Sequence, residues 1–260
     1  MNAIPMINVF SKPCYSQFDD QDWEILAHHW YPVARIQDVN EKPQQVTLLD
    51  VKLAIYKTES GVIHLVRDIC PHRGVPLSKG WVSGGNIVCP YHGLQYNEQG
   101  KCIKIPAQPE LTKISDRFSL TKFPVVEKYG LIWTSLFSRN ESAANFPVLD
   151  TWDTAEHQSI LPPFVDIAGS SGRQLEGFID VAHFAWVHPD TFGDPDNSEV
   201  PDYQTYETDD GFAADYISTV GRYPIGLDQR GAKDFKWLRH FEISVPFTAT
   251  LTIHFPHDAK

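Results

Sequence analysis

The segment Cys70–Gly74 reads Cys-Pro-His-Arg-Gly, and the segment Cys89–Gly93 reads Cys-Pro-Tyr-His-Gly. Each segment offers one thiol and one imidazole, in the order C-x-H, sixteen residues, C-x₂-H. The closing glycine of each segment allows a tight backbone turn, and the proline after each cysteine stiffens it. Two thiolates and two imidazoles are the ligand set of a [2Fe–2S] centre in which two histidines replace two cysteines on one iron. Cys70, His72, Cys89 and His92 are therefore predicted to bind such a cluster.

A structural zinc ion also accepts two cysteines and two histidines. Zinc fingers usually keep the two cysteines together and the two histidines together, whereas here the two residue types alternate, which favours the cluster. The other cysteines, Cys14 and Cys102, have no histidine or cysteine within three residues and are expected to be ordinary apolar thiols. If the metal were zinc, the protein would be a zinc-stabilised interaction module and not a redox protein.

Short strands and glycine-containing turns surround the two cysteine segments. We expect a small antiparallel β domain over residues 25–138, preceded by a polar arm over residues 1–24 and followed by a linker over residues 139–149. The expected strands of this domain are Trp30–Ala34, Val51–Tyr56, Val62–Val66 and Leu131–Phe137, and its expected turns are Ser83–Asn86 and Asn97–Gly100.

Residues 150–260 show a different, mixed pattern. A helical pattern covers roughly residues 174–187, and strands are expected over Phe212–Val220 and Phe241–Phe255. The last strand alternates strictly, with Leu251 and Ile253 on one face. This region is predicted to be an α+β domain whose sheet has one buried face.

The expected helix contains a second group of potential metal ligands, Asp180, His183 and His188, spaced D-x₂-H-x₄-H. Residues three apart share a helix face, so Asp180 and His183 are expected side by side. His183 and His188 are roughly 140° apart on a regular helix and can bind one metal only if the helix ends or bulges between them. Pro189 biases His188 away from helical geometry. Two histidines and one carboxylate form the facial triad of non-haem Fe(II) sites.

A plainer interpretation of the same segment is an amphipathic helix with two histidines that bind no metal. Its buried stripe would comprise Leu175, Phe178, Ile179, Ala182 and Trp186. Four aromatic side chains near this segment could line a substrate pocket or belong to the core, and the sequence does not decide between the two: Phe178, Phe184, Trp186 and Phe192.

The charge balance of the 260-residue chain excludes some classes of partner. The 22 Lys and Arg against 33 Asp and Glu give a formal net charge of −11, which argues against general binding to nucleic acid or to anionic membranes. The first 23 residues do not form a secretion signal, and no run of about 18 apolar residues occurs. A soluble cytoplasmic protein is expected.

The two cysteine segments, the continuation Leu94-Gln95-Tyr96 and the D-x₂-H-x₄-H element resemble the Rieske-type ring-hydroxylating and demethylating oxygenases. The resemblance implies a Rieske [2Fe–2S] domain and a helix-grip catalytic domain. It also implies that His183 and His188 bind a mononuclear Fe(II) and that Asp180 carries electrons between the two metal sites. Val75 and Tyr91 stand where respiratory Rieske proteins have disulfide cysteines, which implies the low-potential type of cluster.

What the resemblance implies for function is a terminal oxygenase component that reductively activates O₂ to hydroxylate, dihydroxylate or demethylate a small organic substrate. A homotrimer is implied as well. The sequence has no G-x-G-x-x-G fingerprint, so a separate NAD(P)H-dependent reductase or a ferredoxin is expected to supply the electrons. The third iron ligand, a carboxylate in relatives, is not assigned and is expected beyond Lys260, in a catalytic domain that is incomplete here. The alternative is a Rieske ferredoxin-like electron-transfer protein without oxygenase chemistry.

Overall fold

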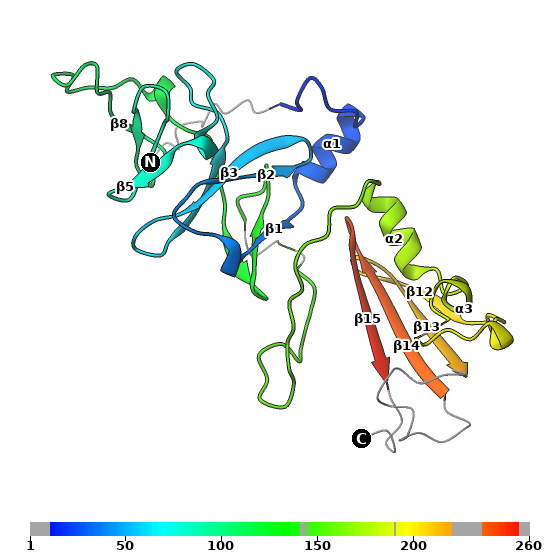
Figure 1. The fold of residues 1–260 in the computed structure, drawn as a ribbon. Coiled ribbons are helices and arrows are strands. Elements are labelled where there is room, and N and C mark those ends of the chain that lie inside the picture. The colour runs from blue at the N-terminus through cyan, green and yellow to red at the C-terminus, as the bar shows by residue number, and fades with distance from the viewer. Residues whose placement is uncertain (1–10, 141–143, 145, 190, 220–235, 255–260) are drawn as a thin grey trace. The chain divides into compact units, whose positions relative to one another are not determined.

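The computed structural model of the chain describes residues 11–140, 144, 146–189, 191–219 and 236–254, and gives only the backbone of 218, 219, 236 and 237. These residues divide into two compact units. The first unit contains the residues up to 144 and the segment 150–163, and the second contains 145–149 and the residues from 164 onwards. Figure 1 shows both units as ribbons.

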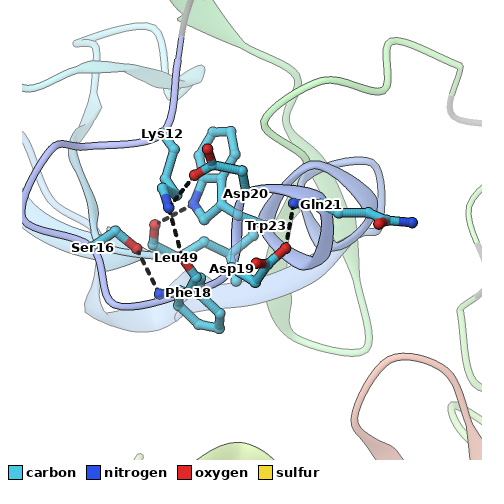
Figure 2. Close-up of polar contacts among 8 residues, drawn as sticks. All are labelled: Lys12, Ser16, Phe18, Asp19, Asp20, Gln21, Trp23 and Leu49. Atoms are coloured by element: carbon cyan, nitrogen blue, oxygen red, sulfur yellow. Dashed lines mark hydrogen bonds and ion pairs between the residues drawn. The ribbon is translucent and has the colours of Figure 1, made fainter.

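The first unit opens with helix α1 (Asp20–Ala27), which lies partly in the segment expected to be a polar arm. Asp19 caps this helix by accepting a hydrogen bond from the backbone N–H of Gln21 at 2.8 Å, as Figure 2 shows. The indole N–H of Trp23 donates to the carbonyl of Leu49 at 2.9 Å, and the Trp23 side chain is buried. Lys12 forms an ion pair with Asp20. The chain is therefore already attached to the β core before residue 25.

Three antiparallel sheets form the rest of the first unit. The first contains β1 (Tyr31–Arg35), β11 (Leu131–Thr134) and β10 (Val126–Lys128). The second contains β2 (Gln44–Leu48), β3 (Val51–Lys57), β4 (Ile63–Arg67) and β9 (Lys122–Phe123). The third contains β5 (Trp81–Ser83), β6 (Asn86–Val88), β7 (Gln95–Tyr96) and β8 (Cys102–Lys104). Short 3₁₀ helices lie at η1 (Ile36–Asp38), η2 (Leu77–Lys79) and η3 (Asp116–Phe118).

The hydrophobic core of this unit has two parts. One part joins α1 to the first two sheets through residues such as Trp23, Leu53 and Leu136. The other lies under the third sheet and contains Cys70 and Cys89 together with a set of apolar neighbours: Ala54, Tyr56, Val66, Leu77, Ile87, Leu94, Tyr96, Cys102 and Leu120. The predicted antiparallel β domain is confirmed, and the two cysteine segments emerge from its second core.

The second unit packs two helices against one antiparallel sheet. The helices are α2 (Ser171–Ile179) and α3 (Phe184–Val187). The sheet contains β12 (Gln204–Thr208), β13 (Gly211–Thr219), β14 (Lys236–Ser244) and β15 (Thr248–His254), and η5 (Pro195–Asn197) precedes it. The ring of Phe178 on α2 meets the ring of Phe241 on β14, with centroids 6.3 Å apart. The α+β fold class is confirmed.

One expected strand of this sheet, Phe241–Phe255, is wrong as a single element. Phe241 lies in β14, the turn Val245–Phe247 follows, and β15 runs back against β14 in antiparallel register. Pro246 in the turn has no N–H to donate to a ladder, which ends the first strand. Phe255 and Val220 lie outside the described residues. Within the described part, no helix is long and apolar enough to cross a bilayer.

Candidate metal centres

The two cysteine segments close with the same backbone hydrogen bonds. In the first, the N–H of Cys70 donates to the carbonyl of Val75 at 2.9 Å, and the N–H of Gly74 donates to the carbonyl of Cys70 at 2.9 Å. In the second, Cys89 donates to Leu94 at 2.9 Å and Gly93 donates to Cys89 at 3.0 Å. Gly74 and Gly93 both have left-handed backbones, with φ of 72° and 69°. The sequence likeness therefore reflects two turns of one geometry.

The four predicted ligands divide by burial. Cys70 and Cys89 are buried, at 2% and 1% exposure, whereas His72 and His92 are exposed at the surface. The centroids of the two imidazole rings lie 4.7 Å apart. The exposed ring of Tyr91 packs on His92 with centroids 3.9 Å apart. Two thiols in the core and two imidazoles at the surface thus come from two neighbouring turns.

Burial and hydrogen bonds act in opposite directions on the charge state of the two thiols. Burial raises the pKa of the Cys89 thiol, while the backbone N–H groups of Tyr91 and His92 act to lower it, and a hydrogen bond with Cys70 raises it further. The hydroxyl of Tyr96 lies 3.1 Å from the Cys70 sulfur. Burial, followed by the proximity of Cys70, raises the pKa of Tyr96, so the hydroxyl keeps its proton for donation. Metal binding would deprotonate the thiols despite their burial.

This donor set fits a [2Fe–2S] cluster with mixed ligands. Each iron of such a cluster takes two protein ligands, a thiolate pair on one iron and an imidazole pair on the other. The thiol pair in the core and the imidazole pair at the surface correspond to the two ends of such a cluster.

The second predicted site lies at a break between two helices and not on one continuous helix. Helix α2 ends at Ile179, and Asp180 is its C-cap with φ of −72° and ψ of 110°. The Asp180 carboxylate accepts a hydrogen bond from the N–H of Ala182 at 2.9 Å, which offers the backbone an alternative to helical bonding. The expected helix over residues 174–187 is therefore wrong between Asp180 and His183.

The break still brings the predicted groups together. His183 is the N-cap of α3 and His188 its C-cap, and their ring centroids lie 5.3 Å apart. The backbone of His188 departs from helical geometry, with φ of −120° and ψ of 40°. The carboxylate of Asp180 lies 3.8 Å from Nδ1 of His183. The requirement that the helix end near the histidines is met by a four-residue helix that begins after one and ends before the other.

The loop after α3 packs closely against the two histidines. Phe192 stacks on His188 with centroids 4.9 Å apart, and Phe184 contacts His183 edge-on at 4.8 Å. A Cβ at Gly193 would lie 1.9 Å from the carbonyl oxygen of Phe184 and 2.9 Å from that of His188. Glycine is therefore required where this loop returns to the helix.

The described residues supply no third ligand for this pair of histidines. Glu242, which lies in the sheet, alternates in direction with Phe241, and Phe241 faces α2 through Phe178. The carboxylate of Glu242 lies 4.0 Å from Nε2 of His240, which is on the same face of the strand as Glu242. Glu242 is thus on the sheet face away from His183 and His188. Asp190 and Asp258 lie outside the described residues.

The four aromatic candidates take different places. Phe184 and Phe192 line a pocket of about 530 Å³ beside α3, together with Tyr216 and Arg239. Phe178 lines a second pocket of about 460 Å³. Trp186 lines neither pocket and is 66% exposed. The expected buried stripe is wrong as a whole, because Phe178 and Ala182 are also exposed, and Leu175 and Ile179 are only partly buried.

Several residues around the sites carry contacts that no motif indicated. Arg239 is buried, and its guanidinium lies 5.4 Å from the ring centroid of Phe184. Burial lowers the pKa of Arg239. Cys102 is buried in the same core as Cys70 and is the cross-strand partner of Tyr96. The contact of Arg239 with Phe184 and the pairing of Cys102 with Tyr96 both depend on strand register, which the sequence pattern alone does not give.

Comparison with known proteins places part of the chain in a described family. Residues 29–124 match the family description "Rieske [2Fe-2S] domain". The chain is 36% identical over 199 residues to methylxanthine N1-demethylase NdmA of Pseudomonas putida, covering 68% of this chain and 52% of NdmA. It is 41% identical over 109 residues to the oxygenase component of dicamba O-demethylase of Stenotrophomonas maltophilia, covering 42% of this chain and 32% of that protein.

A solved structure agrees with the fold over most of the chain. The structure of Pseudomonas putida NdmA with caffeine superposes with a TM-score of 0.75 and 29% sequence identity, covering 88% of this chain and 65% of the NdmA chain. The chain spans about half the length of NdmA as a sequence. The chain therefore carries a Rieske [2Fe–2S] domain and is homologous to the terminal oxygenase components of the Rieske non-haem iron oxygenases.

Proposed function

We propose that the chain forms the cluster-bearing and iron-binding part of the oxygenase component of a Rieske non-haem iron oxygenase. The proposal depends on the presence of two separate groups of potential metal ligands in one chain. The first is a buried thiol pair with an exposed imidazole pair, and the second is the pair of rings of His183 and His188. An electron-transfer ferredoxin would need only the first group. In this proposal residues 25–138 form the Rieske domain, 139–149 the linker and 150–260 the catalytic part. The segment 1–24 before them supplies the start of α1, which packs on the β core.

Cys70, Cys89, His72 and His92 would hold the [2Fe–2S] cluster, and His183 and His188 would hold Fe(II). The cluster supplies single electrons, and the iron supplies open coordination positions for O₂. The exposed imidazole edge of the cluster turns suits electron transfer, because it is the part of the ligand set that another protein surface can approach. We propose no third ligand for the iron from the described residues.

Asp180 would connect the two kinds of site. Its carboxylate lies next to Nδ1 of His183, and its side chain is half exposed at 52%. One oxygen is held by the Ala182 N–H, which fixes the direction of the carboxylate. The other side of the carboxylate remains accessible to an imidazole N–H from a neighbouring subunit. Asp180 therefore would orient His183 while accepting a hydrogen bond from a cluster histidine.

We propose oxidative demethylation of a small aromatic or heteroaromatic compound as the reaction. The relatives named above include demethylases that act on nitrogen and on oxygen. The pocket beside α3 is lined by the rings of Phe184, Phe192 and Tyr216 and also by polar groups, Asp194, Asp196, Asn197, Ser198, Glu199 and Arg239. This mixed lining suits a flat ring that carries polar substituents. Hydroxylation or dihydroxylation of the ring is the competing outcome for the same site.

The partners follow from the same proposal. Electrons would come from a separate NAD(P)H-dependent reductase or a ferredoxin, and the oxygenase would be a cytoplasmic homotrimer in which one subunit's cluster serves the neighbour's iron. The relatives include one named as an oxygenase component, which supports a system of several proteins.

Formaldehyde release tests the proposed reaction. Purified protein, a surrogate reductase, NAD(P)H and O₂ would be incubated with N-methyl and O-methyl aromatic compounds, and formaldehyde measured with the demethylated product. Product should require both metal sites, so Cys70→Ser and His183→Ala should each abolish it. A reducible cluster in protein that forms no oxidised product from any compound would favour the electron-transfer alternative.

A further inference from the structure

Asp68, two residues before Cys70, is a buried carboxylate that accepts three hydrogen bonds, two of which come from Ser78 at the other end of the first cluster turn. It is 6% exposed. One oxygen accepts the backbone N–H of Ser78 at 2.7 Å, and the other accepts the Ser78 hydroxyl at 2.7 Å and the amide of Gln45. Ser78 is itself 6% exposed and lies in η2, just after the turn. The carboxylate thus spans the base of the Ile69–Leu77 segment.

The two cluster turns differ in how their bases are closed. The second turn lies between β6 and β7, whose residues Val88 and Gln95 pair directly in the ladder. The first turn lies between β4 and η2. Strand β4 pairs with β3 and β9, and η2 is a 3₁₀ helix, so the ends of the first turn meet through side chains. The Asp68–Ser78 contact stands where the second turn has a strand pair.

A buried carboxylate is costly unless its hydrogen-bonding capacity is filled. Here both oxygens are filled, and two of the three bonds go to one residue across the turn, so the carboxylate fixes a distance as well as offsetting its own burial. The backbone of Asp68 is anchored from the other side, because its N–H donates to the carbonyl of Lys52 at 2.9 Å. Leu77, next to Ser78, is fully buried in the core beneath the cysteines. Both ends of the contact are therefore rigidly held.

We propose that Asp68 is a positioning residue for the cluster: it closes the first turn so that Cys70 and His72 are held in place to meet Cys89 and His92. The proposal rests on the proposed cluster-binding function. It assigns Asp68 no contact with the metal. The turn of the second ligand pair needs no such residue, since its strands already close it.

The test compares variants that open the first turn with one that weakens the domain elsewhere. Asp68→Ala leaves the Ser78 N–H and hydroxyl unpaired in the core, and Ser78→Ala removes only the hydroxyl bond. Ser135→Ala is the matched control, because Ser135 is fully buried, donates to Ala27 at 3.1 Å and accepts from Ser138 at 3.0 Å far from the turn in sequence. All would be purified as full chains with the cluster reconstituted.

Two measurements separate positioning from general stability. Loss of visible cluster absorption in excess chelator, well below the melting temperature, should be about tenfold faster or more in Asp68→Ala and intermediate in Ser78→Ala, given the cost of leaving buried groups unpaired. Hydrogen exchange should speed up at the amides of Cys70 and Gly74 but not at the equivalent amides of Cys89 and Gly93. Ser135→Ala should change neither the cluster lifetime nor the ratio of exchange between the two turns.

Cluster lifetimes equal to wild type in both variants would overturn the proposal, as would equal acceleration of exchange in both turns. If Asp68→Ala does not fold, Ser78→Ala decides by the same criteria. Wild-type protein that takes up no cluster would overturn the proposed function and this inference together. A wild-type cluster with unaffected variants overturns the inference alone.

Discussion

The hydroxyl oxygen of Tyr96 lies 3.1 Å from the sulfur of Cys70 in the core beneath the cluster turns. A donor to a cluster sulfur stabilises the reduced, more negative state more than the oxidised state and so raises the reduction potential. Tyr96→Phe removes the donor while keeping the ring. If the bond strengthens by about 1 kcal/mol on reduction, the midpoint potential should fall by about 40 mV. Redox titration followed by the visible spectrum measures it.

The control for this variant is Tyr56→Phe. Tyr56 belongs to the same core and packs against His64, with ring centroids 5.3 Å apart. Removal of its hydroxyl tests whether any change in that core shifts the potential. An equal shift in both variants would show that the Tyr96 hydroxyl acts through packing and not through Cys70.

Gly193→Ala should disrupt the histidine pair at α3. The added Cβ would lie 1.9 Å from the Phe184 carbonyl oxygen and 2.9 Å from that of His188, so the backbone on one side must move. Overpacking of this kind costs about 1–3 kcal/mol or more. We expect weaker Fe(II) binding in a titration of cluster-loaded protein, with an unchanged cluster spectrum.

Gly177→Ala is the matched variant, since it adds the same methyl group in the neighbouring helix α2. A Cβ there meets nothing within 4 Å. Replacing a helical glycine with alanine should stabilise the protein by about 0.5–1 kcal/mol. Fe(II) binding should be retained. Equal loss of iron in both variants would contradict the view that the Gly193 contact shapes the site.

Asp180→Asn should slow electron transfer between the metals while leaving each metal in place. The amide oxygen of the substituted side chain can still accept the Ala182 N–H, so the break before α3 should persist. The variant loses the charge beside His183, and charge-assisted hydrogen bonds are about twice as strong as neutral ones. Single-turnover oxidation of pre-reduced protein should be about tenfold to a hundredfold slower. Glu176→Gln on the exposed surface of α2 is the control, and a wild-type rate in Asp180→Asn would remove its bridging role.

His183→Ala and His188→Ala should each lower iron content without bleaching the cluster. The two histidines flank α3 in the chain, their ring centroids lie 5.3 Å apart, and they belong to a compact unit that does not include the cluster turns. Metal analysis and the visible spectrum of the same samples measure both sites. Loss of cluster absorption in either variant would mean that the histidines have been divided wrongly between the two metals.

The cluster turns were predictable because their geometry is local. A cysteine followed four residues later by glycine gives the same pair of backbone bonds in both turns, wherever the turns sit in the fold. In each turn the buried cysteine and the exposed histidine are only two or three positions apart, so the turn itself separates the thiol from the imidazole. The start of α1 was also readable in principle, since Asp19 is an N-cap followed by Asp20 and Asp22 in the first turn.

The remaining features depend on side chains that interrupt or replace regular backbone hydrogen bonding, and a periodic hydrophobic pattern does not reveal them. The 174–187 pattern is helical throughout, yet the Asp180 carboxylate captures the Ala182 N–H and ends α2 early. The run from Phe241 looks like one strand, yet Pro246 interrupts it and β15 folds back on β14. The role of Asp68 depends on Ser78 across the turn, ten residues away, and no spacing rule identifies that pair.

Iron and acid-labile sulfide, measured together in purified brown protein, test the central claim most directly. An oxygenase part with a [2Fe–2S] cluster and an iron held at His183 and His188 must contain more iron than labile sulfide, and His183→Ala should bring the two to equality. Equal amounts in the wild-type protein would indicate a Rieske electron-transfer protein. Colourless protein that contains zinc in place of both would contradict the whole account.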